Sequence, residues 1–156
     1  MKTIGPILFV RGAILSCLLA ASTPALSEGE SKRERGLDMV QKLLAGTGAG
    51  GMPLPDDMTR YTIEHLFGDV WQGHDLSLQD RSLVTCVVLI ALNREAEMKL
   101  HFVGAKNVGV PREKLEAAIT HVAHYAGWPV SISAFRILNE VWPVPVEGGD
   151  AGEEPQ

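Results

Sequence analysis

Hydrophobic residues recur at helical spacing along most of the chain beyond residue 35. The repeats predict helices at residues 37–44, 58–71, 83–92, 93–109, 111–126 and 131–141. No segment alternates between apolar and polar residues over enough positions to indicate a β-strand. We therefore predict an all-α protein, a compact bundle of about six helices.

The helix predicted at residues 83–92 differs from the others because it is apolar on all sides. A helix of this kind is normally buried, so we expect it at the centre of the bundle. The preceding Ser77-Leu-Gln-Asp80 resembles a capping box with Asp in place of the usual Glu. Asp56 or Asp57 and Asn93 are candidate caps for the helices that follow them.

Segments rich in glycine, proline or charge separate and flank these helices. Residues 46–55 contain Gly-Thr-Gly-Ala-Gly-Gly and interrupt the helical pattern. Residues 144–156 are predicted to be a disordered acidic tail. The length suits a single domain with a real core, which we place at residues 28–143.

The first 27 residues have the layout of a signal peptide. Arg11 precedes an uncharged run at residues 13–21, and small residues before Glu28 suit cleavage there. A membrane anchor needs about 20 apolar residues, and Arg11 divides this stretch. Cys17 raises the alternative of a lipid anchor, but further apolar residues follow it. We expect a periplasmic or secreted protein, with no stable membrane insertion once the signal is removed.

The charge argues against nucleic-acid binding, and the cysteine content argues against an intrachain disulfide. Removing residues 1–27 takes away Lys2 and Arg11 and no acid, which changes the net charge from −5 to −7. An acidic protein without a basic stripe is a poor nucleic-acid binder. Only Cys86 then remains, so no intrachain disulfide can form.

Glu97 and His101 are the first candidates for chemistry. They are four residues apart and share one helix face, which lets the carboxylate orient the imidazole and raise its basicity. Apolar neighbours on that face indicate that His101 points inward. A satisfied core histidine is the structural alternative.

Arg81 is the candidate for holding a substrate carboxylate, because a guanidinium grips that group with two parallel hydrogen bonds. The alternative is a surface arginine that pairs with Asp80 or another acid. Tyr125 lies at the edge of a buried helix face, where its hydroxyl could reach a pocket. Trp71 could form an apolar pocket wall or simply belong to the core.

Other polar residues suit structural roles better. His121 and His124 are expected at the surface or at a subunit contact, and Cys86 as a small buried hydrophobe. A metal site from Glu97, His101 and His121 is conceivable, but there is no second Glu-x-x-His motif. We therefore expect no metal.

Four segments carry a resemblance to a known family. They are Phe67-Gly-Asp-Val-Trp71, Asp80-Arg-Ser-Leu-Val-Thr85, Glu97-Met-Lys-Leu-His101 continuing to Gly109, and Tyr125-Ala-Gly-Trp-Pro129. In order and spacing the chain resembles the carboxymuconolactone decarboxylase family. The resemblance implies a small all-helical protein that removes CO₂ from a carboxylated butenolide without a cofactor. It also implies a trimer or hexamer; we expect contacts on the helices that carry His124 and Trp142.

The resemblance implies that His101 is the proton-transfer residue, with Glu97 orienting it and Arg81 assisting. The related branch that resembles alkylhydroperoxidase D uses a Cys-x-x-Cys pair, which this chain lacks. Bulky Trp128 departs from the family pattern and could reshape the substrate pocket. We predict a cofactor-free decarboxylase of a small carboxylated lactone or related acid. A non-catalytic periplasmic binding or assembly protein, or a peroxidase-related antioxidant protein, is the alternative.

Overall fold

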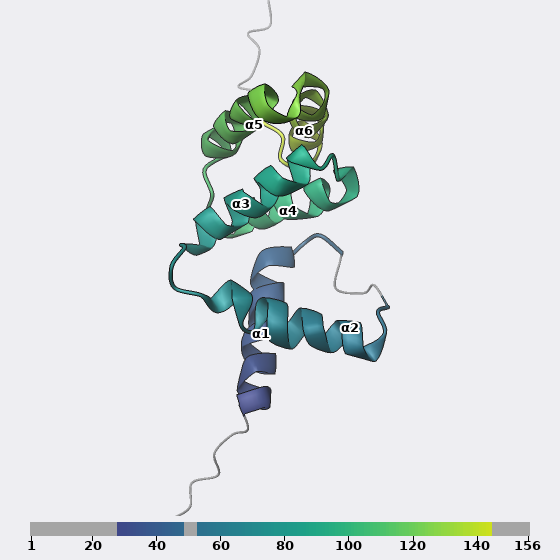
Figure 1. Cartoon of the computed structure of the whole chain (residues 1–156), viewed down its shortest axis with the longest axis vertical. Helices are drawn as coiled ribbons and strands as arrows, with labels where there is room; N and C mark the ends of the chain where they lie inside the picture. The colour runs from purple at the N-terminus through teal and green to yellow at the C-terminus, as the bar shows by residue number, and fades with distance from the viewer. Residues whose placement is uncertain (1–27, 49–52, 145–156) are drawn as a thin grey trace, which may run out of the picture.

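The computed structural model describes residues 28–48 and 53–144, with side chains from Lys32 onward. The predicted signal peptide and the predicted tail from residue 145 lie outside the described residues. The regular elements of the described part are all helices (Figure 1). They are α1 (Glu28–Leu44), α2 (Asp56–Arg60), the π-helix η2 (Tyr61–Phe67), the 3₁₀-helix η3 (Val70–Gln72), α3 (Leu78–Ala91), α4 (Glu95–Asn107), α5 (Arg112–Ala126) and α6 (Trp128–Val141). The predicted all-α bundle is confirmed.

The N-terminal helices pack on one another almost backbone to backbone. The predicted single helix at residues 58–71 is in fact α2 running into the π-helix η2 and then η3. A Cβ atom added to Gly36 would lie 1.9 Å from the carbonyl oxygen of Ile63, and one added to Gly68 would lie 2.1 Å from that of Lys32. Only glycine permits this approach, so α1 and η2 form a tight pair at one end of the molecule (Figure 1).

Helices α3 to α6 form the rest of the bundle, and α4 joins it to α1. The Asn107 side chain donates hydrogen bonds to the carbonyls of Leu43 and Ala45 at the end of α1, at 2.9 and 3.0 Å. Ion pairs connect α4 to α6, with Lys99 to Glu140 at 2.6 Å. The buried side chains between these helices include Phe102, Leu115, Ile119 and Leu138.

Helices α3 and α5 lie side by side and run in the same direction. At their N-terminal ends the Lys114 ammonium lies 2.9 Å from an Asp80 carboxylate oxygen. Further along, Val87 and Ala91 of α3 meet His121 and Tyr125 of α5 around a shared pocket. Helix α4 runs antiparallel to α3, and the Cys86 thiol donates to the His101 carbonyl at 3.5 Å. These contacts fix the height of each α4 and α5 residue along α3.

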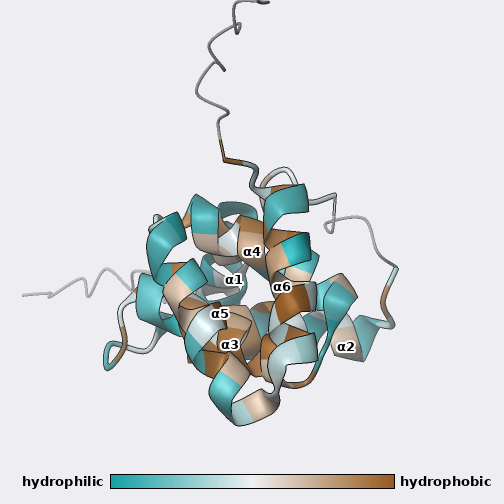
Figure 2. Cartoon of the chain, turned by 90° about the horizontal axis from the view of Figure 1, so that it is seen from above, coloured by the Kyte–Doolittle hydropathy of each residue, from teal (hydrophilic) through white to brown (hydrophobic). Residues whose placement is uncertain are grey.

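The expectation that residues 83–92 are buried on every side is wrong. Helix α3 buries Ser82, Cys86 and Ile90, whereas Val84, Val88 and Leu92 are 52%, 49% and 65% exposed. Seen from above, apolar residues colour much of the α3 ribbon brown (Figure 2). The neighbouring helices cover only part of its circumference, because α4 and α5 pack on adjacent sides.

One predicted helix cap is confirmed, and the other predicted caps are wrong. Ser77 caps α3, since its hydroxyl accepts a hydrogen bond from the Asp80 amide at 3.0 Å. The other proposed caps are wrong: Pro55 precedes α2 and Arg94 precedes α4, with no side-chain cap at either. Asn93 instead adopts a left-handed conformation in the turn, with φ of 50°. The last helix starts at Trp128, three residues earlier than predicted, with Pro129 in its first turn.

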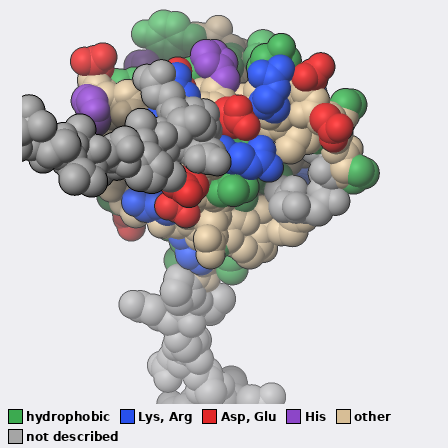
Figure 3. All heavy atoms as spheres, turned by 90° about the horizontal axis from the view of Figure 1, so that it is seen from below, with side chains coloured by type: hydrophobic (Ala, Val, Ile, Leu, Met, Phe, Trp, Pro, Cys, Tyr) green, Lys and Arg blue, Asp and Glu red, His purple; other side chains and the backbone are tan. Residues whose placement is uncertain are grey.

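The surface carries scattered charge. On the face seen from below, acidic and basic side chains are interspersed (Figure 3). No helix among the described residues has both the length and the apolar composition to cross a membrane.

Candidate active site

His101 lies in the middle of α4 and is half-buried. Glu95 and Lys99, which pair with α6, occupy the opposite side of α4, so the His101 side chain lies on the side of α4 turned away from α6. Burial lowers the pKa of His101, and the nearby Glu97 carboxylate raises it by a smaller amount. The imidazole makes no hydrogen bond to another described residue and therefore remains available to a ligand.

Glu97 shares this face, but it does not hydrogen-bond to His101 in the described structure. Its carboxylate instead lies 2.8 Å from the Arg94 guanidinium. That hydrogen bond lowers the pKa of Glu97, so the carboxylate stays ionised. Glu97 therefore acts on His101 through its charge, and its predicted role in fixing the ring orientation stays a prediction.

Arg81 lies in the second turn of α3, five residues N-terminal to Cys86. Its guanidinium donates a hydrogen bond to the Gly73 carbonyl at 3.0 Å and so ties the loop after η3 to α3. In the alternative, Arg81 pairs with Asp80; the Asp80 carboxylate instead binds Lys114 and Ser77. One hydrogen bond leaves further guanidinium N–H groups for a carboxylate.

Trp71 belongs to the apolar core in this chain. It is 8% exposed, and its ring centroid lies 5.9 Å from that of Phe67. This fits the structural alternative for Trp71.

Tyr125 lines a pocket of about 330 Å³ between α3 and α5. The pocket walls are apolar, and the polar groups at the pocket belong to Tyr125 and His121, whose rings are 4.9 Å apart. His121 is exposed, as expected, and its four-residue spacing from Tyr125 is the sequence signal that could have placed it beside this pocket. None of the other predicted site residues lines this pocket.

Trp128 begins α6 and is 65% exposed. Its ring lies 6.1 Å from that of His124, which is also exposed. Trp128 therefore stands beside α5 and does not line the pocket of Tyr125.

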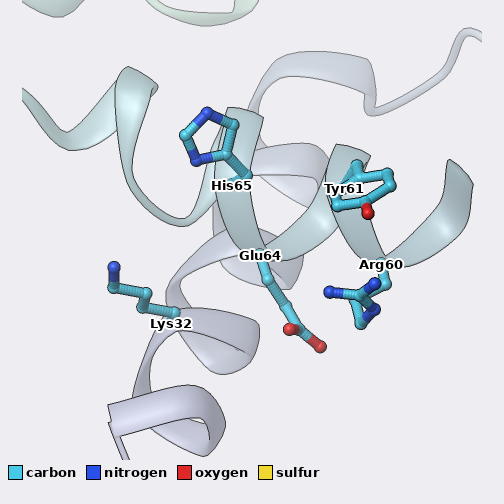
Figure 4. A pocket seen from close by; sticks show the side chains of 5 residues that line it. All are labelled: Lys32, Arg60, Tyr61, Glu64 and His65. Carbon is cyan, nitrogen blue, oxygen red and sulfur yellow. The ribbon is translucent and has the colours of Figure 1, made fainter. Parts of the chain in front are cut away.

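Another hollow on the described surface lies between α1 and η2, away from the predicted residues. It measures about 380 Å³ and is lined by Lys32, Arg60, Tyr61, Glu64 and His65 (Figure 4). Lys32 and Arg60 lie on opposite sides of Glu64 and do not converge. Each charge is already paired: Lys32 with Asp69 at 3.3 Å, Arg60 with Asp57 at 3.1 Å, and Glu64 with Arg33 at 3.4 Å.

The thiol of Cys86 is unsuited to redox chemistry. The residue is fully buried, and burial raises its pKa to about 12. A thiol that stays protonated is a poor nucleophile. Within residues 28–48 and 53–144, no three His, Cys, Asp or Glu side chains gather as metal ligands.

Three of the predicted site residues, His101, Glu97 and Tyr125, thus fall on two sides of the exposed α3 surface. His101 and Glu97 lie on the α4 side, and Tyr125, with His121, lies on the α5 side. The pocket that Tyr125 lines does not include His101 or Glu97.

The fold and these residues define a small all-helical protein with a half-buried histidine suited to acid-base chemistry. The chain belongs to the carboxymuconolactone decarboxylase family, whose model matches residues 56–140. The match includes α3, α4 and α5 and therefore Arg81, Glu97, His101 and Tyr125.

Two curated relatives are decarboxylases. The chain is 37% identical over 86 residues to 4-carboxymuconolactone decarboxylase of Acinetobacter baylyi, covering 55% of this chain and 64% of that protein. It is 33% identical over 87 residues to nitrosuccinic acid decarboxylase npaB of Metarhizium robertsii, covering 56% of this chain and 61% of that protein. The matched region thus spans less than two thirds of either relative.

Proposed function

We propose that the protein is an exported, cofactor-free decarboxylase of a small carboxylated lactone or related acid. The observation that carries this proposal is His101, a half-buried imidazole without a hydrogen-bond partner inside the region that matches the family. Both curated relatives are decarboxylases with different named substrates, which supports the reaction type and leaves the substrate class broad.

The chemistry needs a proton donor and a group that stabilises negative charge. When the C–C bond to the carboxylate breaks, its electron pair stays on the substrate carbon and delocalises onto a neighbouring carbonyl. A cation such as Arg81 stabilises that charge or holds the departing carboxylate. His101 then delivers a proton to the carbon and is reprotonated by water.

The lowered pKa of His101 suits this role once substrate binds. Without substrate, burial favours the neutral ring. An anionic substrate beside the imidazole adds a negative charge to that of Glu97, and both charges favour the protonated ring. The substrate itself thus promotes formation of the acid that its decarboxylation requires.

The direct test is turnover by His101→Ala, assayed by CO₂ release from carboxylated lactones and related acids. Loss of a general acid or base typically lowers the rate by about 10² to 10⁴. His124→Ala is the matched control, because His124 is exposed and its imidazole contacts Thr120 and Trp128 and no predicted site residue on α3 or α4. Full activity in His101→Ala would refute the assignment, and loss of activity through unfolding would return His101 to a structural role.

A binding or assembly protein without catalysis is the second candidate. The observation that favours it is that the Glu97 carboxylate pairs with Arg94 at 2.8 Å and makes no hydrogen bond to His101. A folded protein that binds such acids without releasing CO₂ would support this candidate.

Export is proposed from the charge layout of the first residues. N-terminal sequencing of the protein from the periplasm or medium is expected to begin near Glu28. An intact Met1 in the membrane fraction would contradict it.

A further inference from the structure

We infer that a second copy of this chain covers the exposed face of α3 and completes the active site with its own His121 and Tyr125. The role given to this shared site rests on the proposed function. The inference starts from Val84 and Val88 of α3 and from Leu92, which directly follows the helix; we call these three residues the α3 stripe.

The α3 stripe is apolar, exposed and free of charge. Its residues are spaced four apart, so they form one line along the helix. Between Arg81 and Arg94 the sequence has no charged residue. Apolar surface is favourable to remove from water, and a line of it on a helix is a typical site of protein contact.

The size of this surface indicates what covers it. With the pocket wall of Val87 and Ala91 and the exposed ring of Tyr125, the α3 stripe amounts to roughly a few hundred Å², near the upper range of patches on monomers. A stable interface buries about 800 Å² per partner. A partner seated on the α3 stripe must therefore also cover surface on both sides of it.

Those two sides carry the two halves of the predicted site at matching heights. His101 lies level with Cys86, because the Cys86 thiol contacts its carbonyl. His121 lies level with Val87, because the two residues line one pocket. The two histidines therefore lie at similar heights along α3, His101 on the α4 side of the α3 stripe and His121 on the α5 side.

A second copy of the chain, related by a twofold axis, brings the two sides of the α3 stripe together. A twofold axis in the interface and parallel to α3 exchanges the two sides and preserves height along the helix. The α4 side of each copy then faces the α5 side of the other. His101 of one copy meets His121 and Tyr125 of the next, and the same contact forms twice.

The closed site has the parts that the proposed reaction needs. The stripes exclude water from the reacting carbon, which strengthens the charge interactions there. The apolar pocket receives the body of a small carboxylic acid, while the Tyr125 hydroxyl donates a hydrogen bond to its carbonyl. His101 supplies the proton from the facing copy.

Light scattering tests the interface independently of any activity. The wild type is expected to form an oligomer at micromolar concentration, and Val88→Glu to dissociate it while keeping its helicity. Met58→Glu is the matched control, because Met58 is 53% exposed on α2, at the other end of the molecule. A monomeric wild type, or an oligomer unaffected by Val88→Glu, would overturn the inference.

Mixing two inactive variants tests whether the site is shared. His101→Ala and the double variant His121→Ala, Tyr125→Ala each lack one half of every site. Co-refolding them in equal amounts gives mixed pairs with one intact site, so about a quarter of wild-type activity should return. No recovery, or full activity in the double variant alone, would overturn the shared site.

A cross-linking experiment separates this inference from the proposed function. Glu97 and Tyr125 also lie at matching heights, so chains with Glu97→Cys and Tyr125→Cys, both in a Cys86→Ala background, should join through a short thiol cross-linker. Equal mixtures should yield more mixed than identical pairs. This result supports the interface even if no substrate is turned over, and its absence in an active enzyme overturns the interface alone.

Discussion

The contact of α1 with η2 is tightly packed within one chain, whereas the outer face of α3 stays exposed. At the first, Gly36 and Gly68 let two backbones touch, and ion pairs such as Arg33 to Glu64 at 3.4 Å cover the seam. At the second, Val84, Val88 and Leu92 remain in contact with water.

The α1–η2 contact stabilises the fold, whereas the outer face of α3 remains available for binding. Exposed ion pairs contribute little stability, so the close packing through glycine is what secures α1 on η2. The outer face of α3 contributes little to the fold of one chain. Its neighbours His101 and Tyr125 are the residues we connect with function. The predictions below test this division, beginning with the largest expected effect.

Gly36→Ala should destabilise the α1–η2 contact strongly. The added Cβ would lie 1.9 Å from the Ile63 carbonyl oxygen, so the helices must separate. We expect a loss on the order of 3 kcal/mol in the free energy of unfolding, measured by guanidinium denaturation. Gly48→Ala is the control: an added Cβ would meet no described atom within 4 Å, and its φ of 71° should cost only about 1 kcal/mol. Equal losses would show that the seam is not tightly packed.

Cys86→Ala probes the inner face of α3, opposite the α3 stripe. The side chain is fully buried, so removing its sulfur should cost about 1 to 2 kcal/mol of stability. Turnover should be largely retained, because a thiol with a pKa of about 12 takes no part in proton transfer at neutral pH. A folded but inactive variant would contradict the proposed role of His101.

Ser77→Ala tests the start of α3. Its hydroxyl accepts a hydrogen bond from the Asp80 amide, and loss of such a cap costs about 1 kcal/mol. Ser77→Gly should cost only a few tenths of a kcal/mol in stability. Its melting temperature should therefore be higher than that of Ser77→Ala. The reverse order would mean that the cap is not what begins the helix.

The smallest expected effect is on the pH dependence of stability. Burial lowers the pKa of His101 in the folded chain, so the unfolded chain binds more protons below its ordinary pKa of 6.5. The stability of the wild type should therefore fall as the pH drops below about 6.5. Denaturation at pH 7.5 and 5.5 should show a smaller decrease for His101→Gln. Identical pH dependence would indicate that His101 is well solvated.

Some elements could be predicted because their signals are local. The Ser77 cap is confirmed by its hydrogen bond, and Gly109 and Gly127 end helices with φ of 82° and 100°. Asn93 is a candidate cap by residue type, but its left-handed backbone places it in the turn before Arg94. The π-helical winding of η2 has no sequence signal that we recognise.

The candidate site could be predicted in part. Glu97 and His101 do share a face of α4, but the Glu97 carboxylate pairs with Arg94 at 2.8 Å. Tyr125 does reach a pocket, as expected, whereas Trp71 lies in the core and Trp128 is exposed. Spacing gives the side of a helix on which a residue lies, but not the neighbour that covers that side.

The sequence alone therefore determined the helical class, the family and the residue types available for acid-base chemistry. These depend on local order: the repeat of apolar residues and the spacing of motifs along one helix. Only the tertiary structure decided that α3 keeps an exposed apolar face with His101 on one side and Tyr125 on the other. That outcome depends on which sides of α3 are taken by α4 and α5, and packing between distant segments sets it.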